Sequence, residues 1–185
     1  MRKRPRSRAE TKQKTREALI AAGIAEFTDH GFDTSLDAIC ARAQLTRGAF
    51  YVHFADREAF IVAVMQHVLG GFVAALTRAP DKLDVRMTIR LFLAAVRARA
   101  PIVHGASGLR FHQLVEACRR SQTIGDTYRG LLVTGRDRIA AALQPERRGL
   151  AEVLLVTALG LLVAADLELD VDLDALEREL ISGAR

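Results

Sequence analysis

The chain has 185 residues, of which 50% are hydrophobic, 26% charged and 5% aromatic, and its formal net charge is +5. That apolar content is enough for a buried core, which excludes a largely disordered chain, and the length fits one domain or a small domain joined to a larger one. The most apolar stretch, Val153–Ala165, is too short to span a bilayer. We therefore expect no membrane partner.

No apolar leader follows the basic N-terminus, and Cys40 and Cys118 lie far apart, outside any metal-ligand spacing. These features predict a cytoplasmic protein with no disulfide, metal or other cofactor. Basic residues gather at the front: residues 1–16 hold eight basic side chains and one acidic, whereas residues 146–185 hold four basic and nine acidic. The asymmetry indicates that the N-terminal end meets a polyanion, although a purely solvating role would give the same pattern.

Residues 1–10 are predicted to form a disordered basic arm, since Pro5 blocks an early helix. A helix is then predicted over 11–30, with Leu19, Ile20 and Phe27 at helical spacing and Gly31 as its C-terminal cap.

Two short helices follow. Ser35 is a natural N-cap for a helix over 36–43, and Thr46 for one extending to 53, with a tight turn at Gln44–Leu45 between them. Asp56 can cap a longer helix over 56–77.

Five further helices are predicted over 84–99, 108–120, 124–143, 147–168 and 173–183, with prolines in or beside the breaks. No strand pattern is present, so the fold class is all-α with about nine helices. The predicted organisation is an arm over 1–10, a small helical domain over 11–55 and a larger helical domain over 56–185.

The two short helices and their supporting helix have the form of a helix-turn-helix. Its second helix must be apolar on the inner face and slim on the outer face to enter the DNA major groove. Leu45, Phe50 and Phe54 can anchor that helix, while Arg47 and Tyr51 lie one turn apart on the other face. The pattern favours binding to double-stranded DNA.

The stretch from about 11 to 65 resembles the tetracycline-repressor (TetR) family. The resemblance rests on Phe27, Gly31-Phe32, Thr34-Ser35-Leu36, Leu45-Thr46-Arg47-Gly48-Ala49-Phe50-Tyr51-Val52-His53-Phe54 and Arg57-Glu58-Ala59-Phe60. The start Thr46-Arg47-Gly48-Ala49 is similar to the branch that represses multidrug-efflux genes. Gln44 departs from the glycine common in the turn, so we expect it to adopt a left-handed conformation.

The resemblance implies a homodimeric repressor that leaves a palindromic operator when a small, largely apolar effector binds. It implies base contacts for Arg47 and Gly48. It also implies phosphate contacts for Thr34 or Ser35, Thr46, Tyr51, His53 and Arg57.

In the resembling family, the later helices enclose the effector. Candidates for the pocket lining are Met65, Phe72, Met87, Phe92, Phe111, His112, Glu116 and Tyr128. Each of them also fits an ordinary core or surface position.

The helix over 147–168 is apolar nearly all round, so a second copy of the chain is expected to cover part of it. The predicted dimer interface consists of Val153, Leu154, Thr157, Ala158, Leu161, Leu173, Leu176 and Leu180. The pattern leaves open whether the stripe of Leu154 and Leu161 faces the partner or the chain's own core.

Catalytic motifs are missing: the sequence has no HExxH pair, phosphate-binding glycine loop or GxSxG elbow, so we expect no enzyme and assign no catalytic residue. The alternatives are a basic helical enzyme, an RNA-binding accessory protein or a membrane-surface protein that reuses a helix-turn-helix without small-molecule control.

Overall fold

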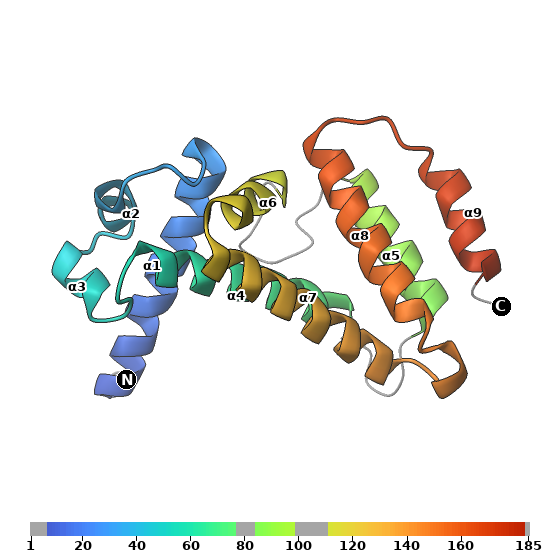
Figure 1. Ribbon diagram of the computed structural model, residues 1–185, viewed down its shortest axis with the longest axis horizontal. Helices are drawn as coiled ribbons and strands as arrows, with labels where there is room; N and C mark the ends of the chain where they lie inside the picture. The colour runs from blue at the N-terminus through green and yellow to red at the C-terminus, as the bar shows by residue number, and fades with distance from the viewer. Residues whose placement is uncertain (1–6, 77–83, 99–110, 184–185) are drawn as a thin grey trace, which may run out of the picture.

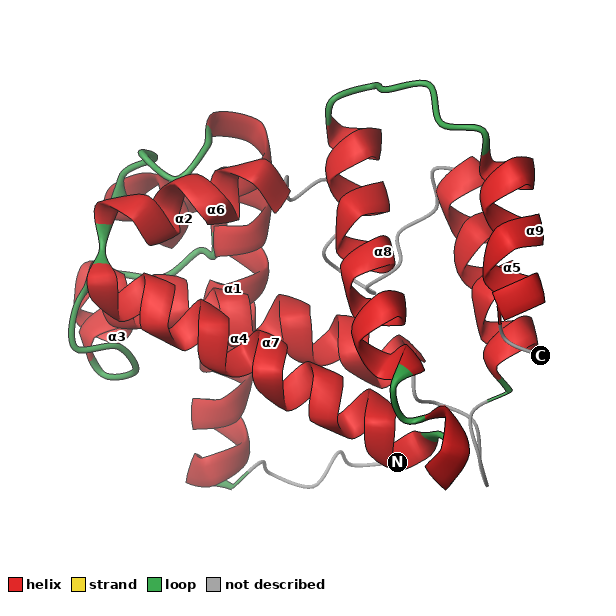
Figure 2. Ribbon diagram, turned by 45° about the vertical axis from the view of Figure 1, so that its right-hand side comes forward, coloured by secondary structure: helices red, strands yellow, loops and turns green. Residues whose placement is uncertain are grey.

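The computed structural model describes residues 7–76, 84–98 and 111–183, whose regular elements are all helices, with no strand in these ranges (Figures 1 and 2). The helices are α1 (Arg8–His30), α2 (Leu36–Arg42), α3 (Arg47–Tyr51), α4 (Arg57–Leu76), α5 (Val85–Arg97), α6 (Phe111–Arg120), α7 (Gln122–Ala142), α8 (Leu150–Asp166) and α9 (Leu173–Gly183), with a 3-10 turn at Pro145–Arg147. The all-α prediction is confirmed. No described helix has the length and apolar character needed to cross a membrane.

Helix α1 begins at Arg8, three residues before the predicted start, because a capping box stabilises its first turn. The Ser7 hydroxyl accepts a hydrogen bond from the Glu10 amide, and the Glu10 carboxylate accepts one from the Ser7 amide. The predicted disordered arm over 1–10 is therefore wrong for residues 8–10, and residues 1–6 of it lie outside the described ranges.

The predicted caps of the short helices are confirmed. Ser35 and Thr46 each accept a hydrogen bond from the amide three residues ahead, at the starts of α2 and α3. In the turn between these helices Gln44 has φ 56°, the left-handed conformation expected from its position. Gly31 ends α1 with φ 77°.

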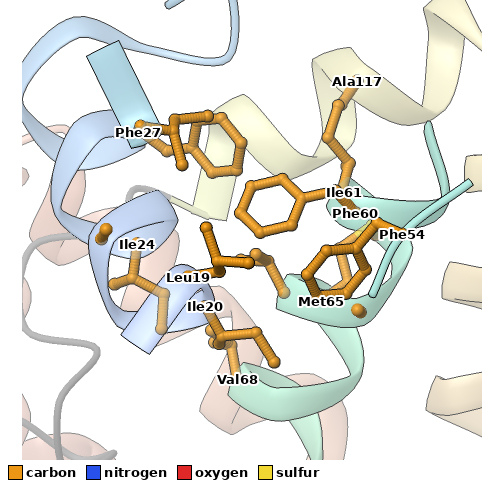
Figure 3. Close-up of a cluster of buried hydrophobic side chains, with 14 of the residues drawn as sticks. Leu19, Ile20, Ile24, Phe27, Phe54, Phe60, Ile61, Met65, Val68 and Ala117 are labelled. Carbon is orange, nitrogen blue, oxygen red and sulfur yellow. The ribbon is translucent and has the colours of Figure 1, made fainter. Parts of the chain in front are cut away.

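The first core lies where α1, α3 and α4 meet (Figure 3). Phe27, Phe50 and Phe60 are fully buried there, and the Phe60 ring lies against the rings of Phe27, Phe50 and Phe54. Gly23 makes room for it, since a Cβ at that position would lie 2.3 Å from Phe60 Cζ. This core, formed around one aromatic ring, fixes α3 to α1 and α4.

We call α1–α3 the head and α5–α9 the body. Helix α4 follows the head and lies side by side with α7 of the body, so these two helices join the two parts (Figures 1 and 2). A second core lies in the body, between α5, α7, α8 and α9. Polar contacts at the α6–α7 junction help to link head and body: Arg120 pairs with Asp33 at 2.9 Å, and the Ser121 hydroxyl donates to Glu58.

Most of the predicted dimer stripe of α8 faces the chain's own core. Ala158 and Leu161 are buried, and Leu154 and Thr157 line a cavity inside the body. On α9, Leu180 lines the same cavity, and the predicted positions Leu173 and Leu176 pack on the second core. Of the eight predicted positions, Val153 is the exposed one, at 47%. Leu154 and Leu161 thus lie on the inward face, because α5, α7 and α9 cover it.

Candidate nucleic-acid interface

Helix α3 exposes a narrow polar face, and the buried residues on its opposite side fix its position. Phe50 is fully buried and Phe54 nearly so, whereas Tyr51 is 53% exposed. Arg47 and Gly48 are exposed at the start of the helix. The predicted anchors and the predicted outward face are therefore confirmed, and Leu45 also packs on the first core.

The Arg47 side chain forms an ion pair with α2. Its Nε lies 3.0 Å from Oδ1 of Asp37, and both side chains are more than half exposed. A guanidinium carries five N–H donors in a planar fork, so this contact leaves donors for another ligand.

Basic residues of α1 lie beside the end of α3, and sequence reasoning did not assign them to the site. The guanidinium of Arg16 lies over the Phe54 ring, 5.4 Å from its centre. Burial lowers the pKa of His53, and the nearby charges of Lys12 and Arg16 lower it further. Lys12 and Arg16 are one helical turn apart, and this spacing was the signal in the sequence that could have placed both on one face of α1. Lys12 and Arg16 thus form a cationic edge next to α3, beside His53.

This edge gives a pH-dependent prediction. A DNA phosphate next to His53 favours its charged form and raises its pKa, so binding takes up a proton. DNA affinity is then expected to rise about threefold to fivefold as the pH falls from about 7.5 to about 6. Fluorescence anisotropy titrations at constant ionic strength would measure it, with His53→Gln expected to lose the dependence.

His67→Gln is the matched control, since His67 is exposed on α4. Stability should change in the opposite sense to affinity. Because the folded pKa of His53 lies below its ordinary value of 6.5, stability rises with pH through that range. If the His53→Gln protein keeps the full pH dependence of binding, His53 does not contact the phosphate.

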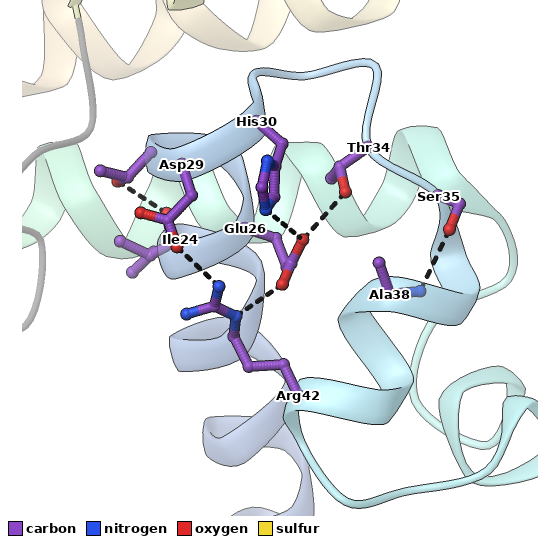
Figure 4. Close-up of polar contacts among 9 residues, drawn as sticks. Ile24, Glu26, Asp29, His30, Thr34, Ser35, Ala38 and Arg42 are labelled. Atoms are coloured by element: carbon purple, nitrogen blue, oxygen red, sulfur yellow. Dashed lines mark hydrogen bonds and ion pairs between the residues drawn. The ribbon is translucent and has the colours of Figure 1, made fainter.

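Thr34 lies in a polar network that holds α2 against α1, and Ser35 caps α2 next to it (Figure 4). Buried Glu26, 6% exposed, accepts hydrogen bonds from Arg42 Nε at 2.6 Å and from the Thr34 hydroxyl at 3.0 Å. The Arg42 guanidinium holds the pKa of Glu26 below its ordinary value. The Thr34 hydroxyl is thus used inside the head, while Ser35 is exposed and caps α2.

Arg57 contacts the loop between α1 and α2. Its guanidinium donates to the backbone carbonyl of Phe32, and burial lowers its pKa. The structure therefore gives Arg57 a role in supporting the loop between α1 and α2.

The residues predicted to line an effector pocket do not gather at one place. Met65 is buried in the first core, Met87 is 54% exposed, and Glu116 pairs with Arg120 at the head–body junction. Tyr128 packs on the first core, where burial raises its pKa to about 12. His112 lies 3.8 Å from Asp166. The side chains of Phe72 and Phe111 lie outside the described part.

Phe92 does line a cavity. This space is apolar, has a volume of about 30 Å³ and lies between α5, α7, α8 and α9. Its walls include Ile89, Leu93, Ile139 and Leu161. Within the described ranges, no group of three or more His, Cys, Asp or Glu side chains is placed to hold a metal ion.

Comparisons with solved structures identify the fold. The E. coli NemR structure, in its reduced form, has a TM-score of 0.69 at 21% identity, covering 90% of this chain and 95% of that one. Regulatory protein TetR from Rhodobacter sphaeroides has a TM-score of 0.66 at 22% identity, with 90% and 96% covered, and Salmonella enterica GusR has 0.66 at 20%, with 92% and 94% covered. A search of curated protein sequences finds no significant match.

Helices α2 and α3, with the exposed face of α3, form a helix-turn-helix, a motif that many DNA-binding proteins place in the major groove. Residues 19–64 match the family model of bacterial regulatory proteins, tetR family. This match covers the helix-turn-helix, so the N-terminal helices of the chain are similar to the N-terminal domain of that family.

Proposed function

We propose that the protein is a homodimeric repressor of the multidrug-efflux type that binds a palindromic operator and releases it when a small apolar molecule binds the body. The observation that carries the proposal is the geometry of α3, whose Arg47 and Tyr51 are exposed above a helix locked in place by Phe50. A helix held in this way can enter the major groove with its first residues at the bases.

Within this proposal the exposed residues have different tasks. Arg47 contacts base edges, where arginine most often binds guanine, and Gly48 lets the backbone come close. Ser35, Thr46, Tyr51 and His53 contact phosphates, joined by Lys12 and Arg16. Thr34 and Arg57 act indirectly, by holding the loop between α1 and α2.

The test is substitution of Arg47. Arg47→Ala is expected to lose about 1–3 kcal/mol of specific binding and to relax base preference at one position in each half-site. Binding-site selection from a random DNA library, followed by titration of the selected site, measures both. Tyr51→Phe is the matched variant and should weaken all sites about evenly. An unchanged base preference in Arg47→Ala would contradict the assignment.

The cavity around Phe92 supports an effector site in the body. Its volume of about 30 Å³ is close to that of one water molecule. An effector of ordinary size therefore enters only if α5, α8 or α9 moves outward. Such a movement couples binding to a change in the shape of the body, as repressor release requires.

For the dimer we propose the outward face of α8 in place of the inward stripe. Val153, Val156 and Leu167 are 47%, 63% and 53% exposed, and Gly160 lies between them with open space where a side chain would be. The spacing places these residues on one side of the helix. A twofold-related copy of α8 would cover this apolar stripe.

Val156→Glu is expected to break that dimer. Burying an unpaired carboxylate costs about 3 kcal/mol, or about 100-fold in the dimer dissociation constant. Sedimentation velocity at micromolar concentration would show a monomer that has lost operator affinity. Val133→Glu on α7, where Val133 is 48% exposed, is the matched control and should stay dimeric. A dimeric Val156→Glu protein would place the interface elsewhere.

A further inference from the structure

The ion pair between Arg47 and Asp37 joins the two helices of the helix-turn-helix on its exposed side. The contact is made by Nε of Arg47, 3.0 Å from Oδ1 of Asp37. The contact is an ion pair that joins the carboxylate to the inner nitrogen of the guanidinium. The two terminal amino groups, whose N–H donors have fixed directions in the planar guanidinium, remain as donors for a base.

A guanine offers two acceptors, O6 and N7, in the major groove. Arginine binds both with two parallel N–H groups, taken either from Nε and one terminal nitrogen or from both terminal nitrogens. A guanine acceptor placed at Nε would lie beside the Asp37 carboxylate oxygen, which is 3.0 Å from that nitrogen, and would be repelled by it, so the second mode is favoured. The ion pair thus restricts Arg47 to an end-on approach that suits guanine.

Asp37 can perform this task because α2 is itself held in place. Arg42, at the other end of α2, is bonded to buried Glu26 at 2.6 Å, and Ser35 caps the first turn. A carboxylate on a helix fixed at both ends is a firm anchor for a flexible side chain. An arginine otherwise loses considerable side-chain entropy when it is ordered at a base.

The same carboxylate has a second effect. Asp37 is 70% exposed beside the DNA-facing end of α3, where a duplex would bring phosphate groups. A negative charge there opposes binding to any duplex, whatever its sequence. As an exposed ion pair it contributes little to folding stability. Its consequences therefore fall on DNA binding.

We infer that Asp37 is a specificity-determining positioning residue: it holds Arg47 by Nε so that the terminal amino groups read a guanine, and it weakens binding to non-matching DNA. The inference rests on the proposed function and names a residue that makes no base contact itself. It predicts two opposite changes when the carboxylate is removed, a loss of guanine preference and a gain in non-specific affinity.

The experiment compares wild type, Asp37→Asn, Arg47→Ala and the double variant by binding-site selection and by titration with a selected and a scrambled duplex at one salt concentration. Asp37→Asn is expected to bind the scrambled duplex about fivefold more tightly, the order expected for one unit charge in water. Its preference for guanine at the Arg47 position should fall about tenfold. In the Arg47→Ala background, Asp37→Asn should leave base preference unchanged.

Three controls separate this role from a structural one. Thermal unfolding should be nearly equal in all variants, Asp137→Asn on α7 removes an equal charge from the body and should alter neither affinity, and Asp37→Glu should restore part of the guanine preference. An unchanged base preference in Asp37→Asn overturns the inference, as does a loss that persists without Arg47, which would mean that Asp37 reads a base directly. If wild type selects no sequence, the proposed function fails and the inference fails with it.

Discussion

Replacing Phe60 with alanine is expected to lower the free energy of unfolding by about 3–5 kcal/mol. Phe60 is fully buried in the first core, and its ring touches those of Phe27, Phe50 and Phe54. These three rings come from α1, from α3 and from the turn after α3. The neighbours are already close-packed around Gly23, so the core has little freedom to close over the space left behind.

Urea unfolding followed by circular dichroism at a fixed protein concentration would measure this loss. Leu91→Ala is the matched control, because Leu91 is 64% exposed on α5 and its truncation should change stability by less than about 0.5 kcal/mol. DNA affinity should fall together with stability in Phe60→Ala, since α3 rests on this ring through Phe50. A loss below about 1 kcal/mol would mean that the core repacks.

Glu26→Ala is expected to cost about 2 kcal/mol at neutral pH. Breaking a buried ion pair typically costs about 3–5 kcal/mol, and the smaller value follows because Arg42 is 38% exposed and regains water. The ordinary pKa of 4.5 exceeds the folded pKa of Glu26, so its contribution is present above 4.5 and is lost as the pH falls through the folded value. The difference from wild type should therefore shrink in acid.

Urea unfolding at about pH 7 and about pH 3.5 tests the size and the sign of this effect. Glu17→Ala is the matched control, an exposed glutamate on the same helix. DNA affinity should also fall in Glu26→Ala, since Glu26 positions α2 through Arg42. An equal loss at both pH values would contradict the assigned role of the Glu26 carboxylate.

The sequence predicted the helices well where their ends carry local signals. Ser35, Thr46 and Gly31 mark helix ends by chemistry within a few residues, and each was confirmed. The early start of α1 was missed because the basic composition and Pro5 outweighed the capping pair of Ser7 and Glu10.

The site was predictable where periodicity reveals a face. Arg47 and Tyr51 are one turn apart, opposite Phe50, and both are exposed. The bond from Arg57 to Phe32 joins residues distant in the sequence and could not be foreseen, while the predicted phosphate contact of Arg57 stays a prediction. Helix α8 is apolar on nearly every side, so its sequence does not indicate which side is buried. It therefore could not show that Leu161 faces inward and Val156 outward.

The first core also determines where this protein could be cut and rejoined. It continues from α1 and α3 into α4 as far as Leu69 and includes Leu114 and Ile124 from α6 and α7. A fragment ending at residue 55 would leave Phe27 and Phe50 without their cover. A hybrid regulator with another protein's effector domain should therefore keep α4 with the head, and the receiving domain should supply side chains that match Leu114 and Ile124 in size.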